Sequence, residues 1–144
     1  MQVYEASSIE KKWQTRWRES DLYKADLMRE GKLGSAERPK YYNVTMFPYP
    51  SGDKLHIGHW YNYGPVDTWG RYMKMKGFDV FQPMGFDSFG LPAENYAIKT
   101  GVHPAKTTRA NIDKMKEQIA AMGGMYDLEL GSGGLETSSP EYYK

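Results

Sequence analysis

With 144 residues, the sequence suits one domain whose core is large enough to fold. A formal net charge of +1 gives no electrostatic reason for this chain alone to bind a polyanion, and the absence of cysteine excludes disulfide bonds and thiolate zinc sites. No apolar run approaches the roughly twenty residues of a membrane span, and the N-terminus lacks a signal peptide's apolar core, so we expect a cytoplasmic protein with no membrane partner.

The first 40 residues are predicted to form a docking helix followed by a loop. Ser7 and Glu10 fit a capping box at the start of a helix over residues 7–20. An apolar stripe recurs every four residues along this helix, formed by Ile9, Trp13 and Trp17. Residues 26–40 are charged and contain Gly, Ser and Pro, which is typical of a loop. We therefore assign residues 1–40 to one N-terminal segment.

A strand is predicted at Tyr41–Phe47, because Tyr, Val, Thr and Phe favour extended structure and Pro48 ends the ladder. A loop rich in proline and glycine follows, and a helical run begins near His56. Pro65 would break a continuous helix, so we predict a one-turn piece and then a new helix from Pro65 to Gly77. The predicted buried face of that helix is Val66, Trp69, Tyr72 and Met73. Its predicted solvent face is Asp67, Arg71 and Lys74.

A second strand is predicted at Phe78–Phe81, and the order strand, helix, strand implies a parallel βαβ unit. Ligands of open α/β sheets bind at the carboxyl ends of the strands. The loop after the first strand and the loop 84–90 after the second should therefore face one crevice. Asp87 then comes within reach of His56, although the two are 31 positions apart. A carboxylate on this loop suits a substrate ammonium, although Asp is also common in turns and N-caps.

Two further helices complete this region. The first is predicted at Leu91–Thr100 and ends at Gly101, and the second spans about 105–122 with Gly123 as its C-cap. The apolar stripe of the second helix is Ile112, Met115, Ile119 and Met122. Residues 41–125 are thus assigned to one βαβ half-domain.

The C-terminal segment, residues 126–144, has a different composition. Residues 131–134 read Gly-Ser-Gly-Gly, which is typical of a flexible linker or a tight hairpin turn. Residues 135–138 could return as a strand. Residues 139–141 could start a helix, but the sequence stops before it can form, so we expect a piece cut from a longer chain.

The chemistry is concentrated between Met46 and His59, where a strand, a loop and a helix start follow one another. Such junctions bind phosphates through free backbone N–H groups and the helix dipole. His56 and His59 share one helical face and can donate N–H without a fixed charge, and Gly58 allows a close approach to the backbone. This favours a nucleotide site where negative charge develops during phosphoryl or nucleotidyl transfer. Two alternatives remain: one histidine packs while the other is solvated, or His56, His59 and Asp87 bind a metal ion.

Three blocks of sequence resemble the leucyl-tRNA synthetases, a branch of the class I aminoacyl-tRNA synthetases. The first is Phe-Pro-Tyr-Pro-Ser-Gly at residues 47–52. The second is Leu-His-Ile-Gly-His at residues 55–59, which matches the class I signature and is followed by Asn62-Tyr63. The third runs from Pro83 to Asn95 and contains Gly-Phe-Asp-Ser-Phe-Gly-Leu-Pro-Ala-Glu. The similarity covers about residues 9–125, breaks at 128–135 and resumes at Ser139.

The resemblance implies the N-terminal half of a Rossmann-like catalytic domain, with a parallel βαβ core and flanking helices. It implies ATP-dependent activation of leucine to leucyl-adenylate, with magnesium arriving on the ATP and no protein-bound metal. In the full-length parent the leucyl group then passes to tRNA(Leu). The catalytic residues implied are His56 and His59. The ATP-binding residues implied are Tyr49, Pro50, His56, Gly58, His59 and Asn62. The leucine-binding residues implied are Met46, Phe47, Tyr49 and Asp87.

The sequence also departs from the family pattern. The second signature, Lys-Met-Ser-Lys-Ser, is absent, and residues 74–76 and 114–116 resemble it only superficially on predicted helices. Its lysines would stabilise the transition-state phosphate. The editing and anticodon-binding parts are absent too. The alternatives to an active fragment are therefore a piece that binds ATP or leucine without catalysis, and a half-sheet whose site is disordered and whose exposed edge favours association.

Overall fold

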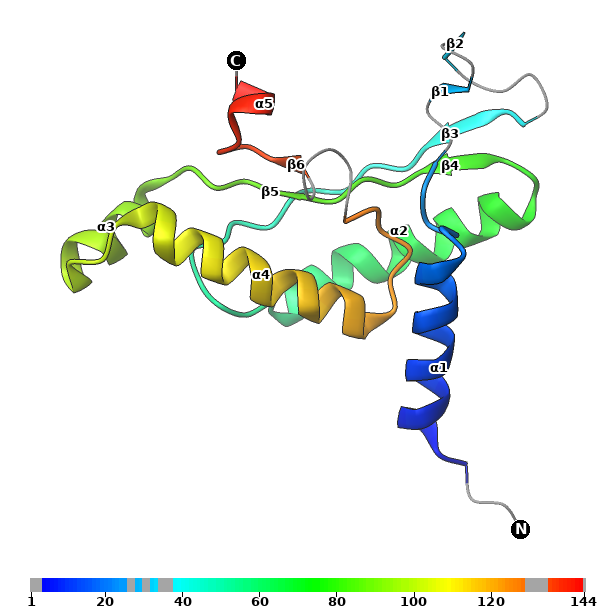
Figure 1. Ribbon diagram of the computed structural model, residues 1–144, viewed down its shortest axis with the longest axis horizontal. Coiled ribbons are helices and arrows are strands. Elements are labelled where there is room, and N and C mark those ends of the chain that lie inside the picture. Colours follow the sequence, from blue (N-terminus) through cyan, green and yellow to red (C-terminus); the bar gives the residue numbers. More distant parts are fainter. Residues whose placement is uncertain (1–3, 26–27, 30–31, 34–37, 129–134, 144) are drawn as a thin grey trace.

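The computed structural model describes residues 4–25, 28–29, 32–33, 38–128 and 135–143 (Figure 1). Within these residues the helices are α1 (Ala6–Glu19), α2 (Ile57–Met75), α3 (Leu91–Thr100), α4 (Pro104–Met122) and α5 (Pro140–Tyr143). The strands are β1 (Met28–Arg29), β2 (Lys32–Leu33), β3 (Lys40–Tyr42), β4 (Asp79–Phe81), β5 (Gly85–Phe86) and β6 (Leu135–Glu136). None of the helices in these ranges is both long and apolar enough to cross a membrane.

One extended segment contains β4 and β5 and joins two short two-stranded parallel sheets, called here together the sheet. It pairs in parallel with β3 through β4 and with β6 through β5. In this segment the odd-numbered Asp79 donates its backbone N–H to the carbonyl of Pro39. The carbonyl of the even-numbered Met84 accepts the backbone N–H of Leu135. Alternate residues of a strand bond to opposite neighbours, so β3 and β6 flank this segment on its two sides. The predicted parallel βαβ unit is confirmed.

The first strand is shorter than the predicted range of 41–47. Regular pairing ends at Tyr42, and the register places Pro83, which has no N–H to donate, where the next ladder bond to β3 would form. Beyond this gap Val44 and Met46 are exposed while Thr45 between them is buried. This alternation indicates that the chain stays extended. It meets the central segment again at Pro48.

The core lies between the sheet and the helices α2 and α4, which run beneath the strands in Figure 1. The predicted stripe of α4 is confirmed: Ile112, Met115 and Ile119 are buried, and Met122 packs against the core. The other members of the hydrophobic core are Tyr63, Met84, Phe86 and Tyr126. The glycines predicted to end α3 and α4 have left-handed backbones, with φ of 69° at Gly101 and 73° at Gly123.

The helix break predicted at Pro65 is wrong, because α2 continues through this residue. Proline removes the hydrogen bond to the carbonyl group four residues earlier and weakens the helix locally. Side chains supply donors to three carbonyl groups near the proline: Tyr126 to that of Tyr63 (2.8 Å), Thr68 to that of Gly64 (2.9 Å) and Asn43 to that of Val66 (2.8 Å). Tyr126 and Asn43 come from outside α2 and Thr68 from within it, so both tertiary and local hydrogen bonds support the helix around the proline.

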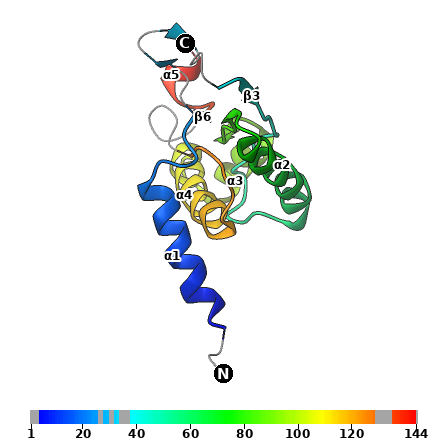
Figure 2. The same cartoon turned by 90° about the vertical axis from the view of Figure 1, so that its right-hand side faces the viewer.

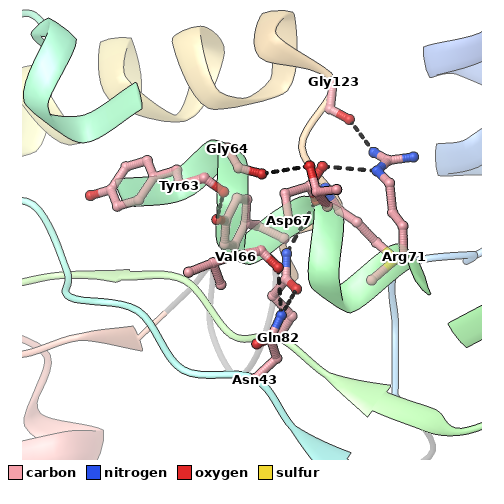
Figure 3. Close-up of polar contacts among 11 residues, drawn as sticks. Asn43, Tyr63, Gly64, Val66, Asp67, Arg71, Gln82 and Gly123 are labelled. Atoms are coloured by element: carbon pink, nitrogen blue, oxygen red, sulfur yellow. Dashed lines mark hydrogen bonds and ion pairs between the residues drawn. The ribbon is translucent and has the colours of Figure 1, made fainter. Parts of the chain in front are cut away.

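The predicted buried face of α2 is wrong at Trp69 and Tyr72, while its other two members, Val66 and Met73, are half-buried. Trp69 and Tyr72 are about half exposed, whereas Tyr63 and Gly70 are buried. Asp67, predicted to face solvent, points to the interior, and its carboxylate accepts hydrogen bonds from three groups (Figure 3). The donors are Arg71 Nε (2.8 Å), Gln82 Nε2 (3.2 Å) and the backbone N–H of Met125 (2.6 Å). With Asp67 held inward by this network, Trp69 and Tyr72 lie on the outer side of α2, whereas Tyr63 packs in the core.

Helix α1 projects from the rest of the molecule, with the N-terminus at its far end (Figure 2). It begins at Ala6 without a side-chain cap, so the predicted capping box at Ser7 and Glu10 is wrong. The guanidinium group of Arg71 lies 5.4 Å from the ring centre of Trp17 and 5.8 Å from that of Tyr23. Cation–π contacts on a residue of α2 therefore hold the C-terminal end of α1 and the turn after it.

The predicted loop at 26–40 contains the antiparallel pair β1 and β2, a correction to that prediction. The Gly-Ser-Gly-Gly stretch lies outside the described residues. The strand predicted at 135–138 is confirmed at β6, which runs parallel to β5. One helical turn, α5, forms despite the prediction that the sequence stops too early, because proline at its first position sets the required backbone angle.

Candidate functional site

His56 and His59 hold the start of α2 through reciprocal hydrogen bonds. The backbone N–H of Gly58 donates to Nδ1 of His56 (3.1 Å), and the backbone N–H of His56 donates to Nδ1 of His59 (3.0 Å). The two imidazole ring centres lie 3.9 Å apart. The predicted pair on one helical face is therefore present, and both residues also act as helix caps.

These hydrogen bonds determine which ring nitrogen carries the proton. Because each Nδ1 accepts a backbone N–H, the proton of each neutral ring is on Nε2. Partial burial of His59, together with the nearby His56, lowers the pKa of His59 below its usual value of 6.5. The His59 ring is therefore neutral at pH 7. Both Nε2–H groups can donate to a phosphoryl oxygen at a helix end whose dipole also favours an anion.

Gly58 is required by the ring beside it. A Cβ at this position would lie 2.9 Å from Cε1 and 3.0 Å from Nδ1 of His56. A larger residue would therefore displace the imidazole that caps the helix. The close approach of adenine at Gly58, implied by the resemblance, remains a prediction.

Helix α4 holds the loop that precedes the histidines. The amide of Asn111 donates to the carbonyl of Pro50 (2.9 Å), and the side-chain oxygen of Gln118 accepts the backbone N–H of Leu55 (2.8 Å). The amide nitrogen of Gln118 also donates to the carbonyl of Asp53 (3.3 Å). Three backbone groups between Pro50 and Leu55 are therefore bonded to side chains of one helix.

An ion pair between the same loop and α4 lies in solvent. The ammonium of Lys114 is 3.2 Å from the carboxylate of Asp53, and this hydrogen bond lowers the pKa of Asp53. Both side chains are at least half exposed, so the pair contributes little to stability.

The two loops predicted to share a crevice are in contact. The backbone N–H of Asp87 donates to the carbonyl of Pro48 (3.1 Å). One small hollow is lined by residues of both loops and the start of α3: Tyr49, Pro50, Ser51, Asp87, Ser88, Phe89, Gly90, Pro92 and Ala93. The hydroxyl of Thr137 accepts the backbone N–H of Ser88 (2.9 Å), so a residue next to β6 supports the second loop.

The remaining predicted site residues lie in different surroundings. Met46 is exposed over 76% of its surface, whereas Phe47 packs against the hydrophobic core. Asn62 is half-buried in the second turn of α2. Their roles toward leucine and ATP remain predictions.

No group of three histidine or carboxylate side chains among the described residues is arranged to hold a metal ion. The alternative of a metal site at His56, His59 and Asp87 is therefore not supported. Two triplets superficially resemble the lysine signature, and the one at residues 114–116 lies within α4. Its Met115 is in the core, and its Lys116 forms an ion pair of 3.1 Å with the buried carboxylate of Glu136.

The sequence reasoning missed the roles of Asn111 and Gln118. Asn is a weak helix former, and its presence in the middle of a predicted helix was a usable signal of a tertiary hydrogen bond. The seven-residue spacing from Asn111 to Gln118 places both amides on one side of α4, next to the apolar stripe.

Comparison with known proteins identifies the family. The family model "tRNA synthetases class I (M)" matches residues 41–128. Leucine–tRNA ligases of Clostridium perfringens and Clostridium tetani are 56% and 53% identical over 139 and 138 residues, which is 96% of this chain and 16% of each relative. The chain thus spans about a sixth of the length of these relatives.

Two solved structures share the fold. The LeuRS of Agrobacterium radiobacter K84, in a ternary complex with tRNA and LeuAMS, is 42% identical with a TM-score of 0.81, covering 97% of this chain and 17% of that one. Methionyl-tRNA synthetase of Mycobacterium tuberculosis, in complex with methionyl-adenylate, is 25% identical with a TM-score of 0.59, covering 72% and 19%. The chain therefore belongs to the class I aminoacyl-tRNA synthetases, and its relatives over nearly its whole length are leucine–tRNA ligases.

Proposed function

We propose that this chain provides the first half of a site that activates leucine with ATP. The observation that carries the proposal is the capping bonds of His56 and His59, which leave the Nε2–H groups of both rings available as donors at a helix N-terminus. ATP phosphates are the ligands that such donors fit, and the complexed LeuRS and methionyl-tRNA synthetase support an adenylate chemistry.

In the proposed reaction a carboxylate oxygen of leucine attacks the α-phosphorus of ATP. A new O–P bond forms, the bond to the β-phosphate oxygen breaks, and pyrophosphate leaves with its magnesium ion. The imidazole donors stabilise charge on the phosphate oxygens as it develops. Asp87, on the second loop of the crevice, binds the α-ammonium of leucine, while Met46, Phe47 and Tyr49 face its side chain. Tyr49, Pro50, Gly58 and Asn62 contact ATP.

Two parts of the proposal concern only the full-length protein. Transfer of the leucyl group to tRNA(Leu), and a location in the cytoplasm, are proposed for the full-length protein. For this chain a second candidate is binding of ATP or leucine without catalysis. It is favoured by the absence of the lysine signature, whose charge would otherwise stabilise the transition state.

Leucine-dependent exchange of pyrophosphate into ATP tests the proposal. The native chain should show exchange that depends on leucine, and Asp87→Asn should reduce it at least tenfold, because the amide keeps the shape but loses the charge for the ammonium. ATP that protects the fold against heat without any exchange would establish the second candidate. Neither exchange nor protection would refute both.

A further inference from the structure

The part of the loop from Pro50 to Leu55, just before α2, is fixed at its two ends by side chains of α4. The side-chain amide of Asn111, which is 8% exposed, donates to the carbonyl of the buried Pro50. The side-chain oxygen of Gln118 accepts the backbone N–H of Leu55. These bonded residues are the immediate neighbours of Tyr49 and His56 in the sequence. The positions of Tyr49, Pro50 and His56, all implied in ATP binding, therefore depend on where α4 holds the backbone.

Helix α4 is a rigid support for this purpose. Its residues Ile112, Met115 and Ile119 are at most 1% exposed and anchor it in the core. Asn111 and Gln118 are seven residues apart, so their anchor points are separated by about 10.5 Å along the helix axis. A buried backbone carbonyl and a part-buried N–H each need a partner, and here both partners come from one helix.

We propose that Asn111 and Gln118 are positioning residues that set the span of the loop, and thereby the placement of Tyr49 and His56 toward ATP. This rests on the proposed function. A group held within about half an ångström of its productive geometry binds and reacts better than one on a mobile loop. The conformational entropy of the loop has then already been lost during folding and does not oppose binding. Lys114 is not part of the proposal, since its ion pair is exposed.

Two measurements on the same variants test it: ATP affinity by calorimetry and hydrogen exchange of the Leu55 backbone N–H by NMR. Asn111→Leu and Gln118→Met keep the approximate shape of each side chain and remove its hydrogen bonds. Gln118→Glu keeps an oxygen that can accept the N–H of Leu55. Gln14→Met is the matched control, because the amide of Gln14 bonds the carbonyl of Ala121 (3.2 Å), away from the loop.

We expect Asn111→Leu and Gln118→Met to weaken ATP binding about tenfold, and Gln118→Met to speed exchange at Leu55 at least tenfold. Gln118→Glu should restore protection at Leu55, and Gln14→Met should change neither quantity. The backbone N–H groups of Ile112 and Ile119 report whether α4 itself is intact.

Native ATP affinity and native Leu55 exchange in Gln118→Met would overturn the proposal. Equal acceleration at Leu55 and at Ile119 would also overturn it, because the substitution would then act through the helix and not through the loop. A native chain that does not bind ATP would refute the proposed function. Exchange at Leu55 would still decide whether α4 holds the loop.

Discussion

The histidines at the start of α2 use different ring atoms for different tasks. Nδ1 of each ring accepts a backbone N–H and caps the helix, while Nε2–H remains available for a ligand. Helix capping and phosphate binding can therefore be separated by substitution. The oxygen of an asparagine side chain can replace Nδ1 as an acceptor, at the N-cap His56 because Asn is a preferred N-cap and at His59 because it can accept the N–H of His56, but asparagine offers nothing at the position of Nε2.

His56→Asn and His59→Asn should therefore change the free energy of unfolding by less than about 1 kcal/mol and abolish protection by ATP. At an ATP concentration of 100 times the dissociation constant, the native fold gains about 2.7 kcal/mol. Urea unfolding with and without ATP measures both effects. Undiminished protection in both variants would show that the imidazoles do not contact the nucleotide.

The pKa of His59 gives stability a defined pH dependence. Burial and the neighbouring His56 lower this pKa below 6.5, so the unfolded chain takes up a proton at a higher pH than the folded chain does. The contribution of His59 is therefore complete above pH 6.5 and declines as the pH falls from 6.5 to the folded pKa. Urea unfolding between pH 7.5 and 5.5 should show a smaller decline for His59→Asn than for the native chain. Equal declines would mean that His59 does not titrate differently in the two states.

At the scale of the elements, the network around Asp67 joins α2 to the central strand and to the chain after α4. Gly70 lies against it, because a Cβ there would be 2.1 Å from Oε1 of Gln82 and 2.8 Å from Nδ2 of Asn43. These two amides bond to each other at 2.5 Å, and each makes a further bond, Asn43 to the carbonyl of Val66 and Gln82 to Asp67, so moving either one would break other hydrogen bonds (Figure 3).

Gly70→Ala should accordingly lower the free energy of unfolding by about 1–3 kcal/mol, although alanine is the better helix former. Gly64→Ala on the same helix is the control, because a Cβ at that position would meet no atom within 4 Å beyond its own helix backbone and chain neighbours. Its gain in helix propensity is offset by the clash of a Cβ with the following proline, so we expect a change below about 1 kcal/mol. Chemical denaturation compares the two, and equal effects would contradict the tight packing at Gly70.

At the scale of the molecule, the sequence predicted what depends on local periodicity. The stripe Ile112, Met115 and Ile119, the helix ends at Gly101 and Gly123, and the parallel βαβ unit follow from spacing and from glycine. The prediction failed where distant residues decide. Pro65 lies within a helix supported by side chains such as Tyr126, and a polar network that local hydropathy could not reveal draws Asp67 inward.

The candidate site was likewise predicted where local sequence decides and missed where distant residues decide. The motif from Met46 to His59 was found from its strand, loop and helix order, and its contact with the loop of Asp87 followed from topology. The support from Asn111 and Gln118 was not found, because it joins residues more than 60 positions apart. The division into segments 1–40, 41–125 and 126–144 remains a proposal.

A long-range ¹H–¹⁵N NMR spectrum of the three histidines, recorded with and without ATP at pH 7, tests most directly whether the capping pair binds nucleotide. His103 is the internal control, because its Nδ1 also caps a helix by accepting the N–H of Ala105 (3.2 Å). We expect unprotonated Nδ1 and protonated Nε2 in His56 and His59, with ATP shifting their Nε2 signals and leaving His103 unchanged. A proton on Nδ1, or Nε2 signals that saturating ATP does not move, would contradict the binding site described for this chain.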